Sequence, residues 1–446
     1  METNTRLDQL SDKKKQLLAL LAKKHSVAVS VPFEMISEED KALLPQNVVD
    51  AYPLGMVQLG MMFHMQHQQS GDIPPDYHNV ASFVLQLSEP FDLQAFQKSV
   101  DRVVELHPGL RTAFELSNFS EPLQLVYEKV QLNVQYIDWR DIPAEQHDDL
   151  LEDFIQQENL NVMDMSSAPL MRLFVHHLAE SKICLSLTEP HSIADGWSTH
   201  LTLIDIFKLY FADIDNLSVD LPKINATYAE FVKAEREILK SHEAIAFWQG
   251  QLANCSDTQL PEKIRSSAKM SLLGEHRPTL DIPEQLVSQL FDVAKQAGVP
   301  IKSVLCAAHL KLLGWMSGQK KVTTGLNFNG RLVEHEDGTN VRGLFLNMLP
   351  LTVELSGGSW LALVQAAHQA ETCILPYRRF PLAELQNMQG EKPLFTTAFS
   401  YLHFHSLAEE GGLEGERMEC LKAIDHSKTN YDFNSVFSLE PYGQAK

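Results

Sequence analysis

The sequence is poor in the features that mark secreted, membrane-spanning and metal-binding proteins. Its five cysteines lie far apart and form no C-x-x-C pair, which argues against a disulfide framework, a zinc site and a redox pair. No apolar run reaches the roughly 20 residues that cross a bilayer. The first thirty residues also lack the layout of a signal peptide. We therefore expect buried free thiols, no membrane partner and a cytoplasmic protein.

Positive charge is also in short supply. The chain has 446 residues, with 37 Lys and Arg against 58 Asp and Glu, which gives a formal net charge of -21. This excess of negative charge repels phosphate backbones, so nucleic acid is not an expected partner. The motifs G-x-S-x-G, H-E-x-x-H, G-x-x-x-x-G-K-[ST] and G-x-G-x-x-G are absent as well. We expect no bound metal and no cofactor held by the chain itself.

What is present is the composition and patterning of a folded α/β protein. Hydrophobic residues make up 44% and charged residues 21% of the chain, and the length suits two or three units of about 150 residues. Short strand-like runs alternate with amphipathic helical runs from Asn79 onward. Strands are predicted at 79–87, 110–116, 122–130, 132–139, 171–190 (two runs around a turn), 321–330 and 345–355, and helices at 92–109, 196–214, 282–298 and 300–318.

The best candidate for a domain boundary is the polar stretch over residues 213–226, which contains a proline and shows no periodicity. We therefore predict a first lobe over residues 31–220 and a second lobe over residues 221–446. Residues 1–30 are predicted to form an N-terminal helix or linker, with a short amphipathic helix over 9–24. Two uses of this helix stay open: packing on its own domain, which is more common, and docking on a neighbour.

The most informative segment joins a strand-like run to a helix and reads E-P-H-S-I-A-D-G-W-S over residues 189–198. His191 can act as a base near neutral pH, because the unperturbed pKa of imidazole is about 6.5. Asp195 can orient the loop through a charged partner. Gly196 allows close approach at the helix start, where free N–H groups favour developing negative charge. On its own, such a pattern is more typical of a hydrogen-bonded pair than of a catalytic one.

This segment resembles the H-H-x-x-x-D-G motif of the condensation domains of non-ribosomal peptide synthetases, and other motifs of that family flank it in the right order. Similar motifs lie at residues 52–64 (opening motif), 107–114 (H-x-x-L-R-T-x-F), 247–252 (Y-W-x-x-x-L), 329–331 with 343–350 (N-x-R and G-x-F-x-N-x-L-P) and 379–385 (late motif). With a family-like tail at 393–399 and 429–433, the resemblance covers nearly the whole chain.

The resemblance implies a fold like that of chloramphenicol acetyltransferase, with two lobes in a V shape and a tunnel between them. Donor and acceptor carrier proteins would dock at the two mouths and deliver thioester-bound substrates on phosphopantetheine arms. The implied reaction is amide bond formation, in which the amine of an acceptor aminoacyl thioester attacks the carbonyl of a donor acyl or peptidyl thioester.

The resemblance also implies roles for single residues. His191 matches the second histidine of the motif, which acts on the attacking amine. Asp195 would be structural and paired with Arg331 across the lobes, and Gly196 would keep the backbone close to the reacting carbonyl. Three further residues are carried over as supporting residues: Trp197, Ser198 and Asn347.

Pro190 departs from the motif, because it stands where the first histidine is expected and removes a polar side chain and a backbone N–H. The heterocyclising branch of the family carries Asp there, so that variant is disfavoured. Two alternatives to amide formation stay open. One is an ester-forming or starter acyl-loading variant of the same fold, and the other is a degenerate domain that only recruits a partner protein.

The remaining features receive structural interpretations. His176 and His177 are adjacent on a predicted strand and face opposite sides, so the pair cannot hold one metal. His403 and His405 share a strand face, but no third ligand is evident. Methionines 56, 61, 62 and 65 predict core filling, with the lining of an acyl path as the alternative. Family members usually continue beyond the region matching 433–440, so an excised or shortened domain and a native start both stay open.

Overall fold

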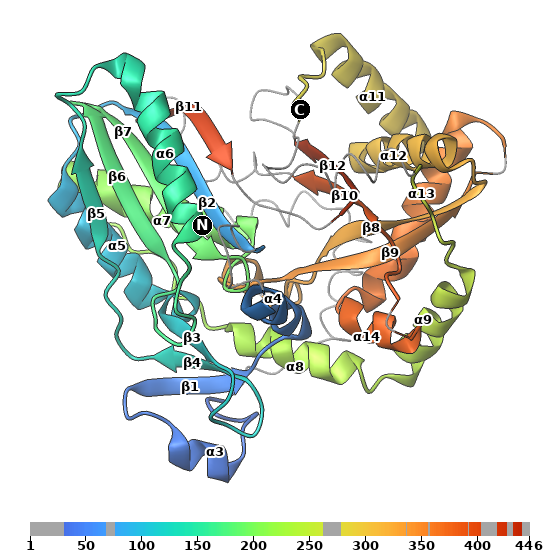
Figure 1. Cartoon of the computed structure of the whole chain (residues 1–446), viewed down its shortest axis with the longest axis horizontal. Helices are drawn as coiled ribbons and strands as arrows, with labels where there is room; N and C mark the ends of the chain where they lie inside the picture. The colour runs from blue at the N-terminus through green and yellow to red at the C-terminus, as the bar shows by residue number, and fades with distance from the viewer. Residues whose placement is uncertain are drawn as a thin grey trace.

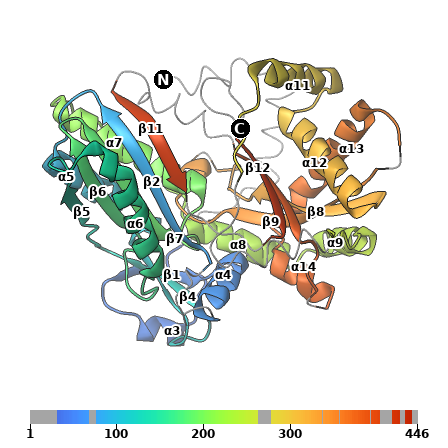
Figure 2. The same ribbon diagram turned by 45° about the horizontal axis from the view of Figure 1, so that its top comes forward.

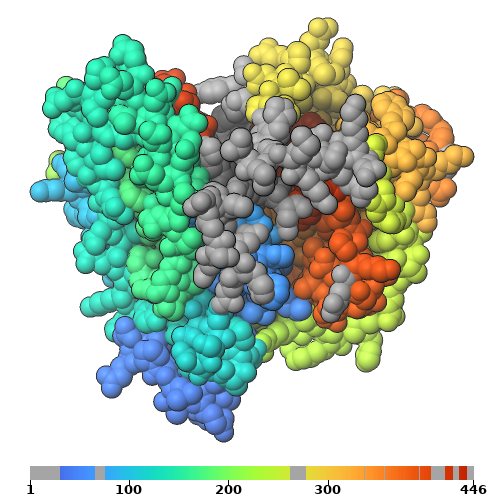
Figure 3. Space-filling model, viewed as in Figure 1, coloured from blue at the N-terminus to red at the C-terminus, as the bar shows by residue number. Residues whose placement is uncertain are grey.

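The computed structural model describes residues 31–67, 76–261, 278–335, 337–355, 357–390, 392–402, 417–425 and 431–438. These residues form two α/β lobes that meet near helices α4 (Met56–His67) and α8 (Tyr228–Ile238) and diverge away from them (Figures 1 and 2). In the space-filling view, the blue-to-green part of the chain occupies one half of the visible face, and most of the yellow-to-red part occupies the other (Figure 3). The predicted α/β fold class is confirmed, whereas the tunnel stays a prediction.

The first lobe is built on a five-stranded sheet with the order β11-β2-β7-β6-β5. Apolar side chains alternate along β7, so that Ile183, Leu185 and Leu187 pack under α5 and α7 while Cys184 faces α6. This alternation gives the sheet two buried faces. The elements are β2 (His78–Leu87), α5 (Leu93–Leu106), β5 (Val134–Asp138), α6 (His147–Leu160), β6 (Arg172–Ala179), β7 (Lys182–Pro190), α7 (Gly196–Ile214) and β11 (Met418–Asp425).

Strand β11 comes from the C-terminal half of the chain, yet it pairs antiparallel with β2, from Met418 opposite Leu87 to Asp425 opposite Ala81. The predicted second lobe, residues 221–446, therefore contains one strand of the first-lobe sheet. The predicted lobes over 31–220 and 221–446 otherwise stay a prediction, and the predicted helix over 9–24 lies outside the described residues.

The second lobe is built on a four-stranded sheet with the order β12-β10-β8-β9. Its core includes the fully buried Trp248, and helices α11 and α12 end where Gly298 and Gly318 take the left-handed conformation that glycine favours. The elements are α8, α9 (His242–Asn254), α11 (Glu284–Ala297), α12 (Ile301–Ser317), β8 (Lys321–Asn329), η3 (Gly338–Asn340), β9 (Leu346–Glu354), α13 (Trp360–Ile374), η4 (Leu375–Tyr377), α14 (Leu382–Met388), β10 (Thr397–Leu402) and β12 (Phe433–Ser438).

A small three-stranded sheet with the order β1-β4-β3 lies beside the junction of the lobes (Figure 1). Strand β1 leads directly into α4, so this sheet sets the position of the opening motif. Its elements and their neighbours are α3 (Glu38–Leu43), β1 (Val48–Pro53), η1 (Pro108–Arg111), β3 (Thr112–Glu115), β4 (Leu123–Tyr127) and η2 (Ala144–Gln146).

The histidine pair on β6 has the predicted structural role. The ring of His176 packs against Trp139 and Phe154, with centroids 4.3 and 4.6 Å apart. His177 lies on the other face, where its Nδ1 is 2.7 Å from the hydroxyl of Tyr136. The two rings therefore do face opposite sides of the sheet, while His403 and His405 lie outside the described residues.

Two other expectations meet mixed outcomes. Met62 and Met65 on α4 are buried, as core filling requires, whereas Met56 and Met61 are only partly buried. All five cysteines are free, but only Cys184 and Cys306 are buried, and Cys373 and Cys420 are exposed. The expectation of buried thiols is therefore wrong for these two, because Cys373 lies on the outer face of α13 and Cys420 on the edge strand β11.

No single helix in the described ranges is long and apolar enough to span a membrane. Helices α11 and α12 meet the length and composition requirements only as a pair, which is bent by 101°.

The segment that leads into β9 reaches back onto the first lobe. Arg342 forms an ion pair with Asp205 of α7, and His107 Nε2 lies 3.2 Å from the same carboxylate. Gly109 packs so closely here that a Cβ atom would lie 2.8 Å from the carbonyl oxygen of Arg342. Two of the motifs that resemble the family, at 107–114 and 343–350, thus adjoin the contact between the lobes.

Gly109→Ala is expected to lower the free energy of unfolding by about 1–3 kcal/mol, because the added methyl group meets backbone that cannot easily move. Gly250→Ala is the matched control, since a Cβ atom at that helical position meets nothing within 4 Å. It is expected to stabilise the protein by roughly 0.5–1 kcal/mol. Urea unfolding measures the change in the free energy of unfolding of both variants. Equal changes in the two variants would contradict the close contact at Gly109.

Candidate functional site

The segment 189–198 occupies the turn between β7 and α7. Asp195 is the N-cap residue of α7, and its Oδ1 accepts the backbone N–H of Ser198 at 2.8 Å. An aspartate at this position satisfies a free N–H group of the helix, and its charge is favourable at the N-terminus. Gly196 is the first residue of the helix and is exposed.

Asp195 also binds the second lobe. Arg331 donates from Nη2 to Asp195 Oδ1 at 2.7 Å, and both side chains are only 1% exposed. The backbone N–H of Phe345 donates to Oδ2 at 3.2 Å. The guanidinium of Arg331 lies 4.2 Å from the ring centre of Phe345 and donates to the carbonyl of Val341 at 2.6 Å. The predicted pair between Asp195 and Arg331 is therefore present and surrounded by further donors and acceptors.

Trp197 and Ser198 extend this contact. Ser198 Oγ accepts from Arg331 Nη2 at 2.6 Å and from the N–H of Gly343 at 3.0 Å, and donates to the carbonyl of Gly343 at 2.8 Å. Trp197 donates from Nε1 to the carbonyl of Thr339 at 3.1 Å. Both residues thus hold the segment 338–345 of the second lobe against the start of α7.

His191 has a defined tautomer and a fixed backbone. Its Nδ1 lies 3.0 Å from the carbonyl oxygen of Ala194. A carbonyl can only accept, so Nδ1 carries the hydrogen, and the neutral imidazole has its lone pair on Nε2. The backbone N–H of His191 donates to the carbonyl of Tyr77 at 2.7 Å. The ring therefore has the form that a general base requires.

The strand pairing explains why a proline is tolerated at position 190. Pro190 ends β7 opposite His78 of β2, and the next residue, His191, points its N–H toward β2. Successive residues of a strand direct their N–H groups to opposite sides, so the nitrogen of Pro190 faces the β6 side. There, β6 begins only at Arg172, opposite Thr188. The proline consequently removes no hydrogen bond of the ladder.

Asn347 lies apart from this group. It is buried on β9, and its Nδ2 donates to the carbonyls of Arg378 and Phe380 at 2.9 and 2.8 Å. Among the described residues no hydrogen bond or ion pair joins it to the segment 189–198. The structure thus brings Asp195, Ser198 and Arg331 together, and places Asn347 in the second lobe as an anchor for the turn at 378–380.

Glu189 is a site residue to which the sequence analysis assigned no role. Its side chain is buried, and Thr199 donates from Oγ1 to Glu189 Oε1 at 2.5 Å. Burial raises the pKa of Glu189 from 4.5 to about 8, and the nearby charge of Asp195 adds to the rise. Glu189 therefore stays neutral at pH 7. The sequence signal for its burial is the alternation of side chains along β7, because residue 189 lies on the same buried face of the strand as Leu187.

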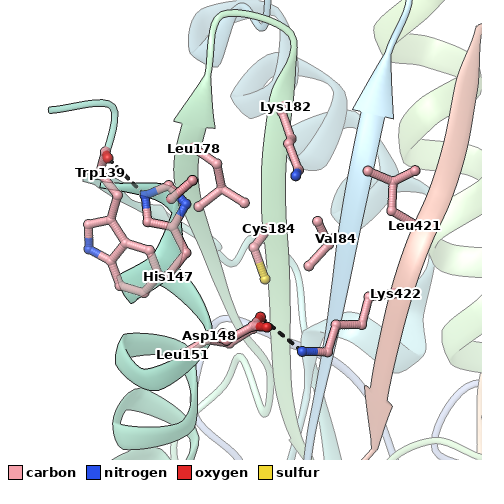
Figure 4. Close-up of a pocket in the computed structure, with 11 residues that line it drawn as sticks. Val84, Trp139, His147, Asp148, Leu151, Leu178, Lys182, Cys184, Leu421 and Lys422 are labelled. Atoms are coloured by element: carbon pink, nitrogen blue, oxygen red, sulfur yellow. Dashed lines mark hydrogen bonds and ion pairs between the residues drawn. The ribbon is translucent and has the colours of Figure 1, made fainter. Parts of the chain in front are cut away.

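The described residues include no group of three or more His, Cys, Asp or Glu side chains that could hold a metal ion. The cavity drawn in Figure 4, of about 280 Å³, lies in the first lobe between α6, β7 and β11. Cys184 points into it, and the ion pair of Asp148 and Lys422 crosses it at 2.9 Å. No residue of the segment 189–198 lines this cavity.

The model of the family described as "Condensation domain" matches residues 48–440. The chain belongs to the condensation-domain family. Condensation domains are acyltransferases of non-ribosomal peptide synthetases, and the family forms amide bonds with the help of carrier protein domains.

Relatives of this condensation domain are segments of much longer proteins. The AMB antimetabolite synthetase AmbE of Pseudomonas aeruginosa is 29% identical over 382 residues, which is 84% of this chain and 17% of that protein. Malpinin synthetase of Mortierella alpina is 26% identical over 407 residues, which is 89% of this chain and 5% of that protein. The chain thus spans a small part of each relative.

Solved structures show the fold of this condensation domain. The condensation domain from the Monacolin K polyketide synthase MokA has a TM-score of 0.72 at 17% identity, covering 90% of this chain and 91% of that one. The starter condensation domain of rhizomide synthetase RzmA has a TM-score of 0.69 at 16% identity, covering 92% and 89%. The predicted chloramphenicol acetyltransferase-like fold is thereby confirmed.

Asp195→Asn is expected to lower the free energy of unfolding by about 3–5 kcal/mol, because it leaves the guanidinium of Arg331 buried without its partner charge. The double variant Asp195→Asn with Arg331→Met should recover part of this loss, since no buried charge remains. Asp138→Asn, which breaks the exposed pair with Arg140, should change little. Urea unfolding measures all three, and a small effect of Asp195→Asn would contradict a buried pair.

Glu189→Gln is expected to remove a pH dependence of stability. Between about pH 4.5 and 8 the unfolded chain has lost a proton that folded Glu189 retains, so the unaltered protein loses stability as the pH rises through this window. The variant keeps the acceptor for Thr199 and has no such titration. At pH 8 it should be more stable than the unaltered protein by on the order of a few kcal/mol, and at pH 4.5 about equal.

Urea unfolding at a series of pH values measures this difference, with the exposed Glu152→Gln as the control. Parallel pH profiles for Glu189→Gln and the unaltered protein would contradict a neutral Glu189.

Proposed function

We propose that the chain catalyses amide bond formation between a donor acyl or peptidyl thioester and an acceptor aminoacyl thioester. The single observation that carries this proposal is the state of His191, whose Nδ1–H donates to Ala194 so that the lone pair lies on Nε2. A base in this form can accept the proton of an attacking amine. Membership of the family supports the reaction class, and the hydrogen bond to Ala194 supports His191 as the base.

In the proposed reaction, the amine nitrogen of the acceptor attacks the thioester carbonyl of the donor, and the C–N bond forms. Nε2 of His191 takes the proton of the amine and passes it to the sulfur as the C–S bond breaks, so that the donor carrier leaves as a free thiol and His191 is again neutral. A placed base contributes typically about 10²- to 10⁴-fold. Holding both thioester arms in one site adds further rate through effective concentration.

The partners in this proposal are donor and acceptor carrier proteins, each with a phosphopantetheine arm. The chain itself binds no cofactor, because the arms bring the reactive groups. Since the relatives are much longer proteins, the carriers are either segments of one polypeptide with this domain or separate chains. Nucleic acid is not among the proposed partners, because the net charge of -21 would repel its phosphates. We retain a cytoplasmic location as part of the proposal.

A second candidate is a starter acyl-loading variant, in which the donor is not a peptidyl chain. It is favoured by the likeness to the rhizomide starter domain, whose structure holds C8-CoA and Leu-SNAC. Donor thioesters offered as fatty acyl or as peptidyl groups separate the two candidates. Acceptors with a hydroxyl or an amine nucleophile, offered side by side, separate ester from amide formation.

His191→Ala is expected to abolish amide formation, because no other residue of the segment 189–198 offers an imidazole. The assay mixes a loaded donor carrier with a loaded acceptor carrier and reads the product on the acceptor by mass spectrometry. His242→Ala, which removes an exposed imidazole from α9, is the matched control and should keep full activity.

Unchanged product formation by His191→Ala would remove this residue from the mechanism. If the unaltered chain forms no product but binds a carrier as tightly as the variant does, the domain is a partner-recruiting module instead.

A further inference from the structure

The strand pairing shows where the side chain of the motif's missing first histidine would stand. Pro190 and Thr188 lie on one face of β7, opposite to that of Leu187 and Glu189. This is the face that α6 covers, because Cys184, which shares it, packs against α6. An imidazole at position 190 would therefore lie under α6, on the far side of the sheet from α7.

An imidazole already occupies this place, but it comes from the neighbouring strand. His78 is the first residue of β2 and is directly opposite Pro190. Directly opposed residues share one face of a sheet, with Cβ atoms about 4.5–5.5 Å apart. The ring of His78 thus stands beside the position from which the motif's first histidine would project.

His78 is held by α6. Its Nε2 lies 3.1 Å from the carbonyl oxygen of Glu158 in the last turn of α6, so Nε2 carries the hydrogen. The ring is 3% exposed, and its Nδ1 has no hydrogen-bond partner among the described residues. Burial lowers the pKa of His78, with the charge of Arg172 as a further cause, so the imidazole is neutral at pH 7.

The residue before His78 connects it to His191. Tyr77 has a φ of 63°, a conformation that a bulky residue adopts only when its surroundings impose it. Its carbonyl accepts the N–H of His191 at 2.7 Å. A shift of His78 away from α6 would turn the Tyr77 carbonyl and release the backbone of His191.

We infer that His78 takes the place of the motif's missing first histidine and acts as a positioning residue for His191. Two hydrogen bonds carry this effect. The Nε2–H of His78 donates to the carbonyl of Glu158 and holds His78 in place, and the carbonyl of the adjacent residue, Tyr77, accepts the N–H of His191. His78 does not touch the reacting atoms. The inference rests on the proposed function in the tests that measure kcat, and not in the test that uses spectra.

The test exchanges the two positions. His78→Ala removes the imidazole and is expected to lower kcat by about ten- to a hundredfold at unchanged KM, as small displacements of a catalytic group do. In the double variant His78→Ala with Pro190→His, an imidazole from β7 enters the space that His78 vacates. We expect this variant to regain most of the lost kcat. His78→Phe keeps the volume of the side chain but not the N–H, and its kcat should fall as that of His78→Ala does. It replaces His78→Ala in the test if that variant does not fold.

His176→Ala is the matched control. His176 is also a buried imidazole on the α6 face of this sheet, but it packs between Trp139 and Phe154, and neither of its ring nitrogens has a hydrogen-bond partner among the described residues. It should lower stability without lowering kcat. Two results would overturn the inference. One is an equal loss of kcat in His78→Ala and His176→Ala, which would show that lost stability alone lowers kcat. The other is a loss of kcat in His78→Ala that the added Pro190→His does not restore.

A second measurement does not need activity. In ¹H–¹⁵N spectra of the histidine side chains, the Nδ1–H signal of His191 should shift or broaden in His78→Ala and return in the double variant. An unchanged His191 signal would overturn the inference. If the unaltered chain is inactive with every pair of thioesters, the proposed function fails, and the spectra alone decide the role of His78.

Discussion

The candidate site depends on the ion pair between Asp195 and Arg331. Removing two charges from water is costly, and further hydrogen bonds to the two groups offset part of that cost. Here the N–H of Phe345 donates to Asp195, and Ser198 Oγ and the carbonyl of Val341 accept from Arg331, while Arg331 Nε has no hydrogen-bond partner among the described residues. Because Asp195 caps α7 and binds the second lobe with the same carboxylate, the loop that carries His191 takes its shape from the meeting of the two lobes.

The described groups on either side of the His191 turn supply hydrogen bonds rather than net charge. The turn is held at one end by the Tyr77 carbonyl and at the other by the cap of α7. Glu189 on one face of β7 and His78 on the other are both neutral at pH 7, because burial disfavours their charged forms. The carboxylate of Asp195 is paired with Arg331. The carbonyl of Tyr77 thus holds the backbone of His191, and the carbonyl of Ala194 sets the tautomer of its imidazole.

Local patterns predicted the elements well and the junction less well. The helix over 196–214 has the predicted bounds, since an aspartate cap and helical spacing are local signals. The pairing of β11 with β2 joins residues more than three hundred positions apart, and no periodicity reports it. His78 was not singled out for a similar reason. A cross-strand neighbour is defined by register, and one strand's sequence does not contain the register of its partner.

A second ion pair also joins α7 to the second lobe. Asp205 lies ten residues after Asp195 on α7, a separation of about 15 Å along a helix, and it binds Arg342 of the same second-lobe segment that holds Arg331. Two attachment points on one rigid helix resist rotation about either of them. An opening that separated this segment from α7 would have to break both buried ion pairs, which is costly because each would leave an uncompensated charge.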